Sequence, residues 1–121
     1  MTGPPPSGLT VTVDDTPGAL TVHVAGELDY DTSGELLDAV TGRLARGVAP
    51  SGGVRLDFAG LTWIDSSGLS ALIVIHRRAG EAGAALHLDN RPGVMERALH
   101  LTGLLEHLTA PRSGGPAGPP G

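Results

Sequence analysis

Two short segments near the start of the chain alternate between apolar and polar positions. The first is Leu9-Thr10-Val11-Thr12-Val13 and the second is Leu20-Thr21-Val22-His23-Val24. A period of two is typical of a β-strand with one buried face. The segment between them, Asp14-Asp15-Thr16-Pro17-Gly18, consists of residues that are common in turns. The pattern therefore predicts a β-hairpin.

After the hairpin the apolar spacing changes to that of an amphipathic helix. Thr32 and Glu35 stand three residues apart, which is the spacing of a capping box. Arg46-Gly47 supplies a cation and a glycine of the kind that ends a helix. The apolar positions between these signals share one face, and they are Leu36, Leu37, Val40 and Leu44.

Strands and helices alternate through the rest of the chain. The expected elements are a strand over 54–58, a helix from Asp65 to about Gly80, a strand over 85–88, a helix from 92 to 103 and a short turn over 104–108. A hairpin followed by strands that helices connect implies an α/β fold with a mixed sheet. The strands joined by helical crossovers should be parallel.

The two ends of the chain lack apolar side chains. Residues 1–7 and 110–121 are rich in Gly and Pro, and we expect disordered tails around one folded unit over 8–109. A chain of 121 residues fits a single domain. The sequence has neither the pattern of a signal peptide nor an apolar run long enough to span a membrane, which favours a cytoplasmic protein.

The composition excludes several kinds of chemistry. All eight basic residues are arginines and the chain contains no cysteine. Without lysine there is no Walker-type phosphate loop and no Schiff-base catalysis, and without cysteine there is no thiol nucleophile or cysteine zinc site. A net charge of −5 disfavours nucleic acid and anionic membranes as partners.

The segment with most chemical content is Asp65-Ser66-Ser67-Gly68, at a predicted strand-to-helix junction. One interpretation is an ordinary helix cap, because side-chain oxygens at this position accept unpaired backbone N–H groups. The other is an exposed serine at the positive end of a helix, where a phosphate is electrostatically tolerated. Phosphorylation there would add charge without unfolding the helix.

The helix that follows has two faces. We expect Leu69, Leu72, Ile73 and His76 to face the core, and Ser70, Val74, Arg77 and Arg78 to point away from it. An apolar Val74 beside arginines suits a protein-binding surface. The alternative is a single exposed valine, which is common on protein surfaces.

Acidic residues follow the second predicted strand. Parallel strands end at one edge of the sheet, so Asp29 and Asp31 are expected near Asp65 and Ser66 as part of a site, or else as solvated loop residues or caps. The same segment begins like a calcium-binding loop but has Val40 where the bidentate glutamate belongs, and we predict no metal site. Trp63 and Met95 are interpreted as packing residues.

Four segments occur in the order and spacing of a known family. They are Gly26-Glu27-Leu28-Asp29, Val54-Arg55-Leu56-Asp57-Phe58, Leu61-Thr62-Trp63-Ile64-Asp65-Ser66-Ser67-Gly68-Leu69 and Leu101-Thr102-Gly103-Leu104. Together they resemble the STAS-domain family of bacterial anti-sigma factor antagonists, over about residues 9 to 109. The Asp-Ser-Ser-Gly-Leu run is the most specific part. Trp63, the absence of lysine and the long tails depart from the family pattern.

The resemblance implies a STAS fold with four or five strands in a mixed sheet, and a regulatory protein with neither catalysis nor a cofactor of its own. Such proteins bind an anti-sigma factor that is also a serine kinase, and so release a sigma factor. The kinase phosphorylates the antagonist and breaks the complex, and a metal-dependent serine/threonine phosphatase restores it. The phosphorylated position is expected at Ser66, with Ser67 as the alternative.

The same domain type also occurs as an interaction module in stress-sensing complexes and in lipid-transport machines. For the antagonist role, Asp29 matches an acidic loop position near the partner surface. The residues expected to bind a partner are Asp29, Asp31, Asp65, Ser66, Ser67, Gly68, Ser70, Val74 and Arg77.

Overall fold

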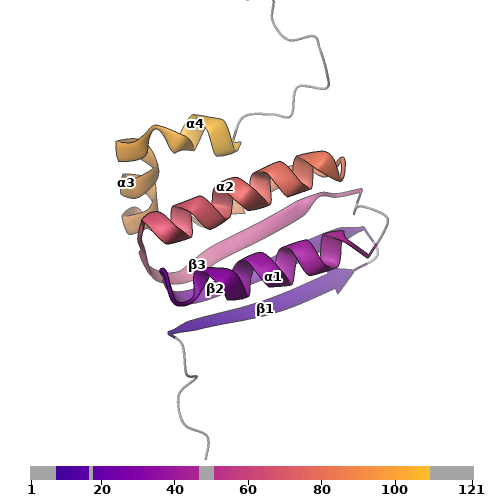
Figure 1. Ribbon diagram of the computed structural model, residues 1–121, viewed down its shortest axis with the longest axis horizontal. Helices are drawn as coiled ribbons and strands as arrows, with labels where there is room; N and C mark the ends of the chain where they lie inside the picture. Colours follow the sequence, from indigo (N-terminus) through magenta and orange to yellow (C-terminus); the bar gives the residue numbers. More distant parts are fainter. Residues whose placement is uncertain (1–7, 17, 47–50, 110–121) are drawn as a thin grey trace, which may run out of the picture.

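The chain folds into a hairpin followed by alternating helices and strands, as the hydrophobic pattern predicts (Figure 1). The computed structural model describes residues 8–16, 18–46 and 51–109. The elements are β1 (Leu9–Thr16), β2 (Ala19–Leu28), α1 (Ser33–Leu44), β3 (Val54–Ile64), α2 (Ser66–Glu81), β4 (Leu86–Asp89), α3 (Gly93–Thr102) and α4 (Leu104–Thr109). The predicted disordered tails and the predicted helix-ending Gly47 lie outside the described residues.

The four strands form one mixed sheet in the order β1-β2-β3-β4. β1 pairs with β2 antiparallel, whereas β2 with β3 and β3 with β4 are parallel. The predicted mixed sheet is confirmed, with four strands. β3 is longer than expected and continues past Phe58 to Ile64, with register shifts opposite β2 between His23 and Ala25 and between Gly26 and Glu27.

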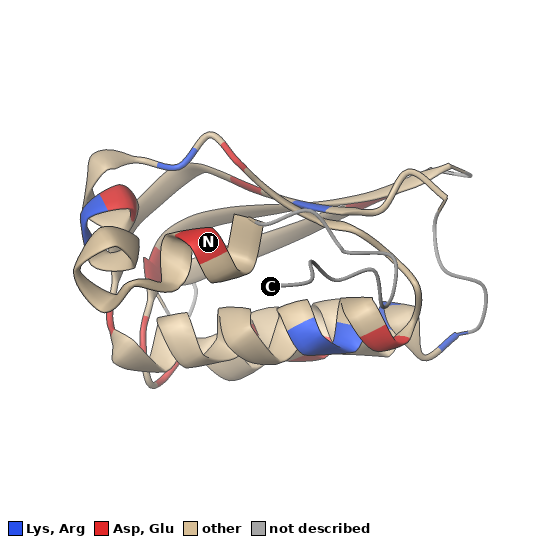
Figure 2. Cartoon of the chain, turned by 90° about the horizontal axis from the view of Figure 1, so that it is seen from above, with Lys and Arg blue, Asp and Glu red and all other residues tan. Residues whose placement is uncertain are grey.

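Helices α1 and α2 lie side by side over one face of the sheet, while α3 contacts β3 and α4 contacts β4 (Figure 1 and Figure 2). Alternate side chains of the inner strands are buried beneath them, including Val22 of β2 and Leu56 of β3. The chain is poor in aromatics, so the core is aliphatic around the buried Phe58. Met95 is fully buried, which confirms its predicted packing role.

The buried face of α2 is rotated slightly from the expected one. Leu69 and Leu72 are buried as predicted, but Ile75 completes the face and Ile73 lies at its margin. The buried face also contains small residues, which let this helix approach its neighbours; they are Gly68, Ala71 and Ala79. His76 is half-buried rather than central, and its ring lies 4.9 Å from that of His107 in α4, centroid to centroid. Burial lowers the pKa of His76, and the neighbouring His107 lowers it further.

The opposite face of the sheet carries polar side chains in cross-strand pairs. His23 Nδ1 lies 3.0 Å from an Asp57 carboxylate oxygen, and Arg55 donates to Asp89 of β4 at 3.0 Å. Asn90 also donates to Asp57, at 3.0 Å. The Asn90 amide and then the Ala59 backbone N–H hold the pKa of Asp57 below its ordinary value, and His23 adds to this effect. The polar alternation predicted along the strands therefore forms a solvated face.

Candidate functional site

The loop between β2 and α1 is fixed by hydrogen bonds from its own side chains. Asp29 Oδ1 accepts from the backbone N–H of Asp31 at 3.0 Å and from that of Thr32 at 3.2 Å. The Thr32 hydroxyl donates to the Glu27 carbonyl at 2.8 Å and accepts from the Asp29 N–H at 2.9 Å. Thr32 is only 2% exposed. Asp29 and Thr32 therefore hold the loop in one conformation.

These bonds correct the prediction of a capping box at the start of α1. Thr32 is the residue before the helix, but its side chain makes no cap hydrogen bond. Its hydroxyl is used instead by the preceding loop, where it faces Glu27 and Asp29. A threonine that is buried against the end of a strand satisfies its hydroxyl there, so it is not available to the helix.

The junction between β3 and α2 is capped by an aspartate. Asp65 is extended, with φ −120° and ψ −170°, and its carboxylate accepts from the N–H groups of Ser67 at 2.9 Å and Gly68 at 3.1 Å. This is the ordinary cap foreseen for the segment. Because Asp65 performs it, neither serine is needed for capping. Ser66 is exposed at the first turn of the helix, and Ser67 is half-buried.

Gly68 brings this junction against the end of β2. A Cβ atom on Gly68 would lie 2.7 Å from the Leu28 carbonyl oxygen and 2.8 Å from Cγ1 of Ile64. The backbone N–H of Asp65 donates to the same Leu28 carbonyl at 3.2 Å. The start of α2 therefore packs directly on the residue that precedes the Asp29 loop, and the two loops meet at one end of the molecule.

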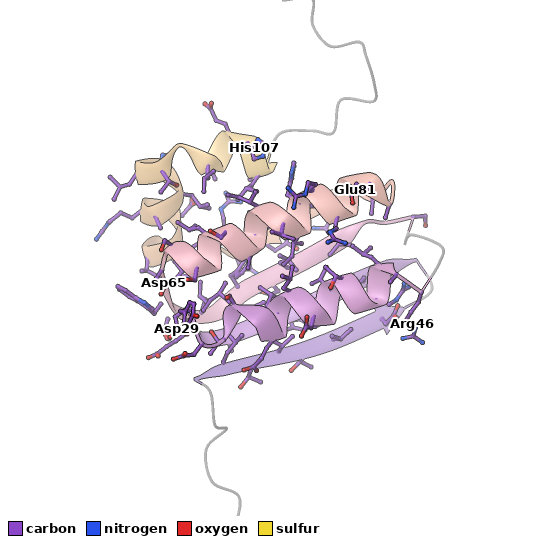
Figure 3. All side chains as sticks on the ribbon, viewed as in Figure 1. Asp29, Arg46, Asp65, Glu81 and His107 are labelled. Carbon is purple, nitrogen blue, oxygen red and sulfur yellow. The ribbon has the colours of Figure 1, made fainter. Side chains whose placement is uncertain are left out.

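Most of the residues predicted to bind a partner lie at this end. Figure 3 shows Asp29 and Asp65 close together there, with Arg46 and Glu81 at the opposite end. We call this region the serine end and define it by Asp29, Tyr30, Asp31, Trp63, Asp65, Ser66, Ser67 and Gly68.

Ser70 and Val74 continue from the serine end into a cleft between α1 and α2. The cleft has a volume of about 310 Å³, and Tyr30, Leu37 and Ser67 also line it. Val74 is half-buried there, beside Leu37 of α1. Arg77 is exposed and does not line this cleft. It stands 11 residues after Ser66, about 16 Å along the helix axis, so it lies apart from the serine end.

The serine end has acidic groups but neither a visible catalytic pair nor a metal cluster. Asp29 and Asp65 are half-buried at this end, and Asp31 is exposed in the Asp29 loop. Within residues 8–16, 18–46 and 51–109, no hydrogen bond joins the Ser66 hydroxyl to a histidine or a carboxylate. The same residues contain no group of three or more His, Asp or Glu placed to hold a metal ion. Nor does any helix among them have the length and apolar character needed to cross a bilayer.

The family model described as "Mlab, STAS domain" matches residues 11–109, which is most of the chain. The chain belongs to the STAS-domain family. The resemblance found in its motifs is therefore confirmed. No match was found among the curated proteins.

Solved structures share the fold of this STAS domain. An anti-sigma factor antagonist from Mycobacterium paratuberculosis has 27% sequence identity and a TM-score of 0.72, covering 90% of this chain and 88% of that one. The phosphorylated form of the Bacillus cell-fate determinant SpoIIAA has 19% identity and a TM-score of 0.64, covering 78% of this chain and 85% of that one. The murine anion transporter Slc26a9 has 18% identity and a TM-score of 0.66 over 77% of this chain, which matches 15% of the transporter. The last two likenesses concern the fold alone.

Two aromatic residues of this STAS domain were missed as candidates. Tyr30 in the Asp29 loop is 81% exposed, and Trp63 near the end of β3 is 51% exposed. The prediction that Trp63 is a packing residue is wrong. The expected strand ended at Phe58, whereas β3 continues to the buried Ile64, and alternation along this continuation places Trp63 on the outside. Exposed aromatic side chains are typical of protein-binding surfaces.

Proposed function

We propose that this STAS domain is an anti-sigma factor antagonist that binds an anti-sigma factor with serine kinase activity and so releases a sigma factor. Phosphorylation of Ser66 switches it off. The observation that carries the proposal is the exposed Ser66 hydroxyl at the start of α2, next to a cap that Asp65 provides alone. The 27% identical mycobacterial antagonist supports the general role. SpoIIAA has been solved in unphosphorylated and phosphorylated forms, which supports a switch of this type.

The fold would survive phosphorylation. Ser66 begins a helix of 16 residues, and its side chain contributes no described hydrogen bond that a phosphate would break. The partial positive charge of the helix N-terminus stabilises a nearby anion. Asp65 keeps its bonds to Ser67 and Gly68 in either state, because it bonds backbone groups rather than the serine hydroxyl. The switch therefore changes charge at a fixed surface.

Phosphorylation of Ser66 would prevent binding of the partner. A phosphate adds about −1.5 to −2 charges at pH 7. Asp65 directly precedes Ser66 and Asp29 lies close to Asp65 (Figure 3), whereas the exposed arginines of α2, Arg77 and Arg78, lie toward the other end of that helix. A partner that packs on a neutral hydroxyl would have to bury a dianion, and the two exposed arginines of α2 lie roughly three turns away along the helix. Such desolvation costs several kcal/mol, which weakens binding by two or more orders of magnitude.

Three serine variants test the proposal with the purified partner kinase and ATP. Wild type should gain one phosphate, located at Ser66 by mass spectrometry, and should then dissociate. Ser66→Ala should bind the kinase with or without ATP, and Ser66→Asp should bind at least 100-fold more weakly than wild type, given the charge penalty above. Ser51→Ala is the matched control, since Ser51 is an exposed serine that precedes β3, whereas Ser66 follows that strand. Phosphate on Ser67 or elsewhere would refute the assignment to Ser66.

In this proposal the chain acts in the cytoplasm, needs no cofactor and has no catalytic activity of its own. A metal-dependent serine/threonine phosphatase would return it to the binding state. The second candidate is an interaction module of a transport system, which the likeness to part of the anion transporter Slc26a9 favours. Affinity purification with Ser66→Ala separates the two. Recovery of an ATP-binding kinase supports the antagonist, and recovery of a membrane transporter component supports the alternative.

A further inference from the structure

The two edges of the sheet differ in length and in cover. β4 has four residues and contacts α4, whereas β1 has eight residues and forms the other edge, beyond β2 (Figure 1). β1 pairs with β2 without interruption, from Leu9↔Gly26 to Thr16↔Ala19. It contains neither proline nor lysine, and its register has no bulge. Of the usual devices that block an edge strand, it has only the charges of Asp14 and Asp15, near its C-terminal end.

The outer edge of β1 presents backbone groups of alternate residues. The Glu27 N–H donates to the Gly8 carbonyl at 2.9 Å, one step beyond the Leu9↔Gly26 pair. In an antiparallel ladder every second pair exchanges hydrogen bonds, so the even-numbered residues of β1 bond to β2. Val11 and Val13 consequently direct their N–H and C=O groups away from β2. No strand of the described sheet lies on that side.

The same residues leave apolar surface uncovered. Val11 and Val13 lie on the helix-covered face, because their register partners Val24 and Val22 are buried there. Val13 is nevertheless 43% exposed. A strand placed beside β1 would cover this side chain and would pair the backbone groups of both valines.

We propose that this strand is β1 of a second copy of the chain, in antiparallel register about a two-fold axis at Thr12. In this register Val11 faces the partner's Val13, so the residues with outward backbone groups bond one another. Thr12 faces the partner's Thr12 on the open face of the sheet. Odd-numbered residues face odd-numbered ones, so both pairs of covering helices lie on the same side of one continuous sheet.

The charges of β1 fit this direction. Asp14 and Asp15 both lie near its C-terminal end. In the antiparallel register Asp14 faces the partner's Thr10, and four residues, about 13 Å, separate it from the partner's Asp14. That separation exceeds the Debye length of about 8 Å at physiological ionic strength. Parallel pairing would place the two Asp14 carboxylates opposite each other, so a second copy fits in the antiparallel direction.

The dimer would leave both serine ends open. β1 begins beside Gly26, which places its Leu9 end toward the serine end of the same copy. The two-fold axis then directs the two serine ends in opposite directions. Dimerisation through β1 and partner binding at Ser66 are therefore independent, and either can fail in an experiment without the other.

Engineered cysteines test the register, since the natural chain has none. Two residues that face each other without mutual hydrogen bonds in an antiparallel pair have Cα atoms about 4.5 Å apart, within disulfide reach. Under mild oxidation most of the Thr12→Cys protein should migrate as a covalent dimer in a non-reducing gel. Thr10→Cys is the matched control on the same exposed face of β1, and it should stay monomeric. Equal cross-linking of both variants, or of neither, would overturn the proposal.

Sedimentation equilibrium tests the interface without a cross-link. The full-length wild type should sediment at twice the mass of the chain. Val13→Lys should sediment at the mass of one chain, because it places a charge against the partner's Val11. Leu101→Lys, at an 80% exposed apolar residue of α3, should remain a dimer. A wild type that sediments as a single chain, or a folded Val13→Lys that remains a dimer, would overturn the proposal.

Discussion

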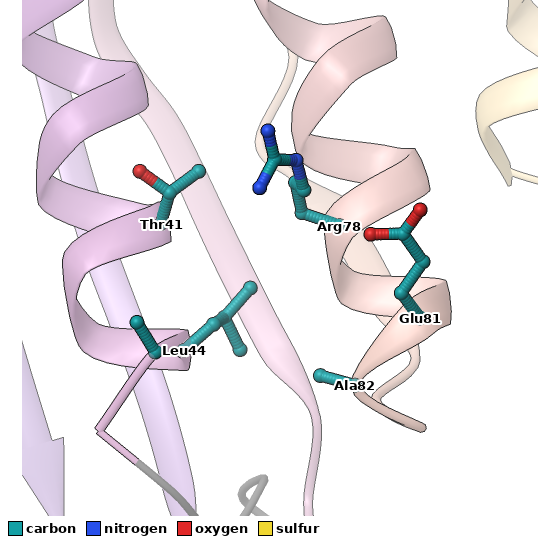
Figure 4. A pocket seen from close by; sticks show the side chains of 6 residues that line it. Thr41, Leu44, Arg78, Glu81 and Ala82 are labelled. Carbon is teal, nitrogen blue, oxygen red and sulfur yellow. The ribbon is translucent and has the colours of Figure 1, made fainter.

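The α1–α2 helix pair is held differently at its two ends. At the serine end, side chains of Asp29, Thr32 and Asp65 bond backbone groups of the loops, and Gly68 packs on the Leu28 carbonyl. At the other end the helices enclose an open cleft of about 240 Å³, shown in Figure 4 and lined by Thr41, Leu44, Ala45, Arg78, Glu81 and Ala82. We call this region the far end. The difference lies in the hydrogen bonds that hold the loops, since a cleft between the same two helices is present at both ends.

The far end relies on a solvent-exposed ion pair. The Arg43 guanidinium of α1 contacts the Asp15 carboxylate of β1 through two nitrogens, one of them at 3.1 Å. Exposed pairs of this kind contribute little to stability and are weakened by salt. Loop hydrogen bonds that are partly buried contribute more, because a group left without its partner cannot regain water. Rigidity therefore concentrates where Ser66 is displayed.

This contrast fits a surface that changes charge while its backbone stays fixed. The exposed residues of the serine end, such as Ser66 and Tyr30, take no part in the bonds that hold its loops. Substituting these exposed residues should leave the fold unchanged, whereas substituting Gly68 or Thr32 should destabilise it. Substitutions at the two ends test this difference, because those at the serine end should cost more unfolding free energy than those at the far end.

The largest effect is expected at Gly68. A Cβ in Gly68→Ala would meet backbone and side-chain atoms at 2.7–2.9 Å, closer than normal contact. Overpacking of this kind costs about 2 kcal/mol of unfolding free energy or more, and urea denaturation measures it. Gly42→Ala is the control in α1 near the far end, where a Cβ meets nothing within 4 Å. It should gain up to about 1 kcal/mol from helix propensity. If Gly68→Ala and Gly42→Ala had equal unfolding free energies, the serine end would not be more tightly packed than the far end.

The second-largest loss of stability is expected from Thr32→Val. Valine keeps the shape of the buried side chain but leaves the Asp29 N–H and the Glu27 carbonyl without their partner. An unsatisfied buried group costs about 1–3 kcal/mol, and thermal unfolding followed by circular dichroism should show the loss. Thr41→Val at the far end also removes a hydroxyl, but that hydroxyl bonds only the Leu37 carbonyl of its own helix. Its effect should stay within about 0.5 kcal/mol. A neutral Thr32→Val would show that the loop is not held by this bond.

Local periodicity was sufficient to predict the elements but not their contacts. The hairpin, both inner parallel strands and the Gly103 helix end follow from spacing that each segment carries by itself, and Gly103 does adopt the left-handed conformation, with φ 73°. The length of β3 does not follow, because β3 continues through a shift in register with β2 that local alternation cannot show. Trp63 was misplaced for that reason.

The sequence was sufficient to predict which residues lie at the site, but not which hydrogen bonds each of them makes. The motif around Ser66 and the meeting of parallel strand ends place Asp29 and Asp65 together, as the structure shows (Figure 3). Which hydroxyl caps a helix and which one fixes a loop depends on burial, and Thr32 was misassigned because its neighbours in space are Glu27 and Asp29 rather than Glu35. Exposure of Tyr30 likewise depends on tertiary packing.

A smaller effect is expected from Asp65→Ala. The variant removes the cap from the N–H groups of Ser67 and Gly68, which costs about 1 kcal/mol. Ser66→Ala, one residue further along, should change the unfolding free energy by less than about 0.5 kcal/mol, because its hydroxyl holds no described bond. Urea denaturation of both variants at pH 7 measures the difference. A Ser66→Ala loss as large as that of Asp65→Ala would mean that the serine is part of the cap.

The smallest effect is expected at the far end, from Arg43→Gln. The Arg43 guanidinium holds the pKa of Asp15 below its ordinary value, mainly through the side-chain hydrogen bond. A carboxyl with a lowered folded-state pKa contributes stability above its unfolded pKa of about 3.9, and the contribution is lost as the pH falls through the folded-state pKa. The free energy of unfolding of the wild type should therefore be slightly larger than that of Arg43→Gln at pH 6 and low salt. The two values, measured by urea denaturation, should become equal in strong acid or in 1 M salt. Because the pair is exposed, salt should screen it. A difference in unfolding free energy that persists in 1 M salt would mean that Arg43 stabilises the far end by packing rather than by charge.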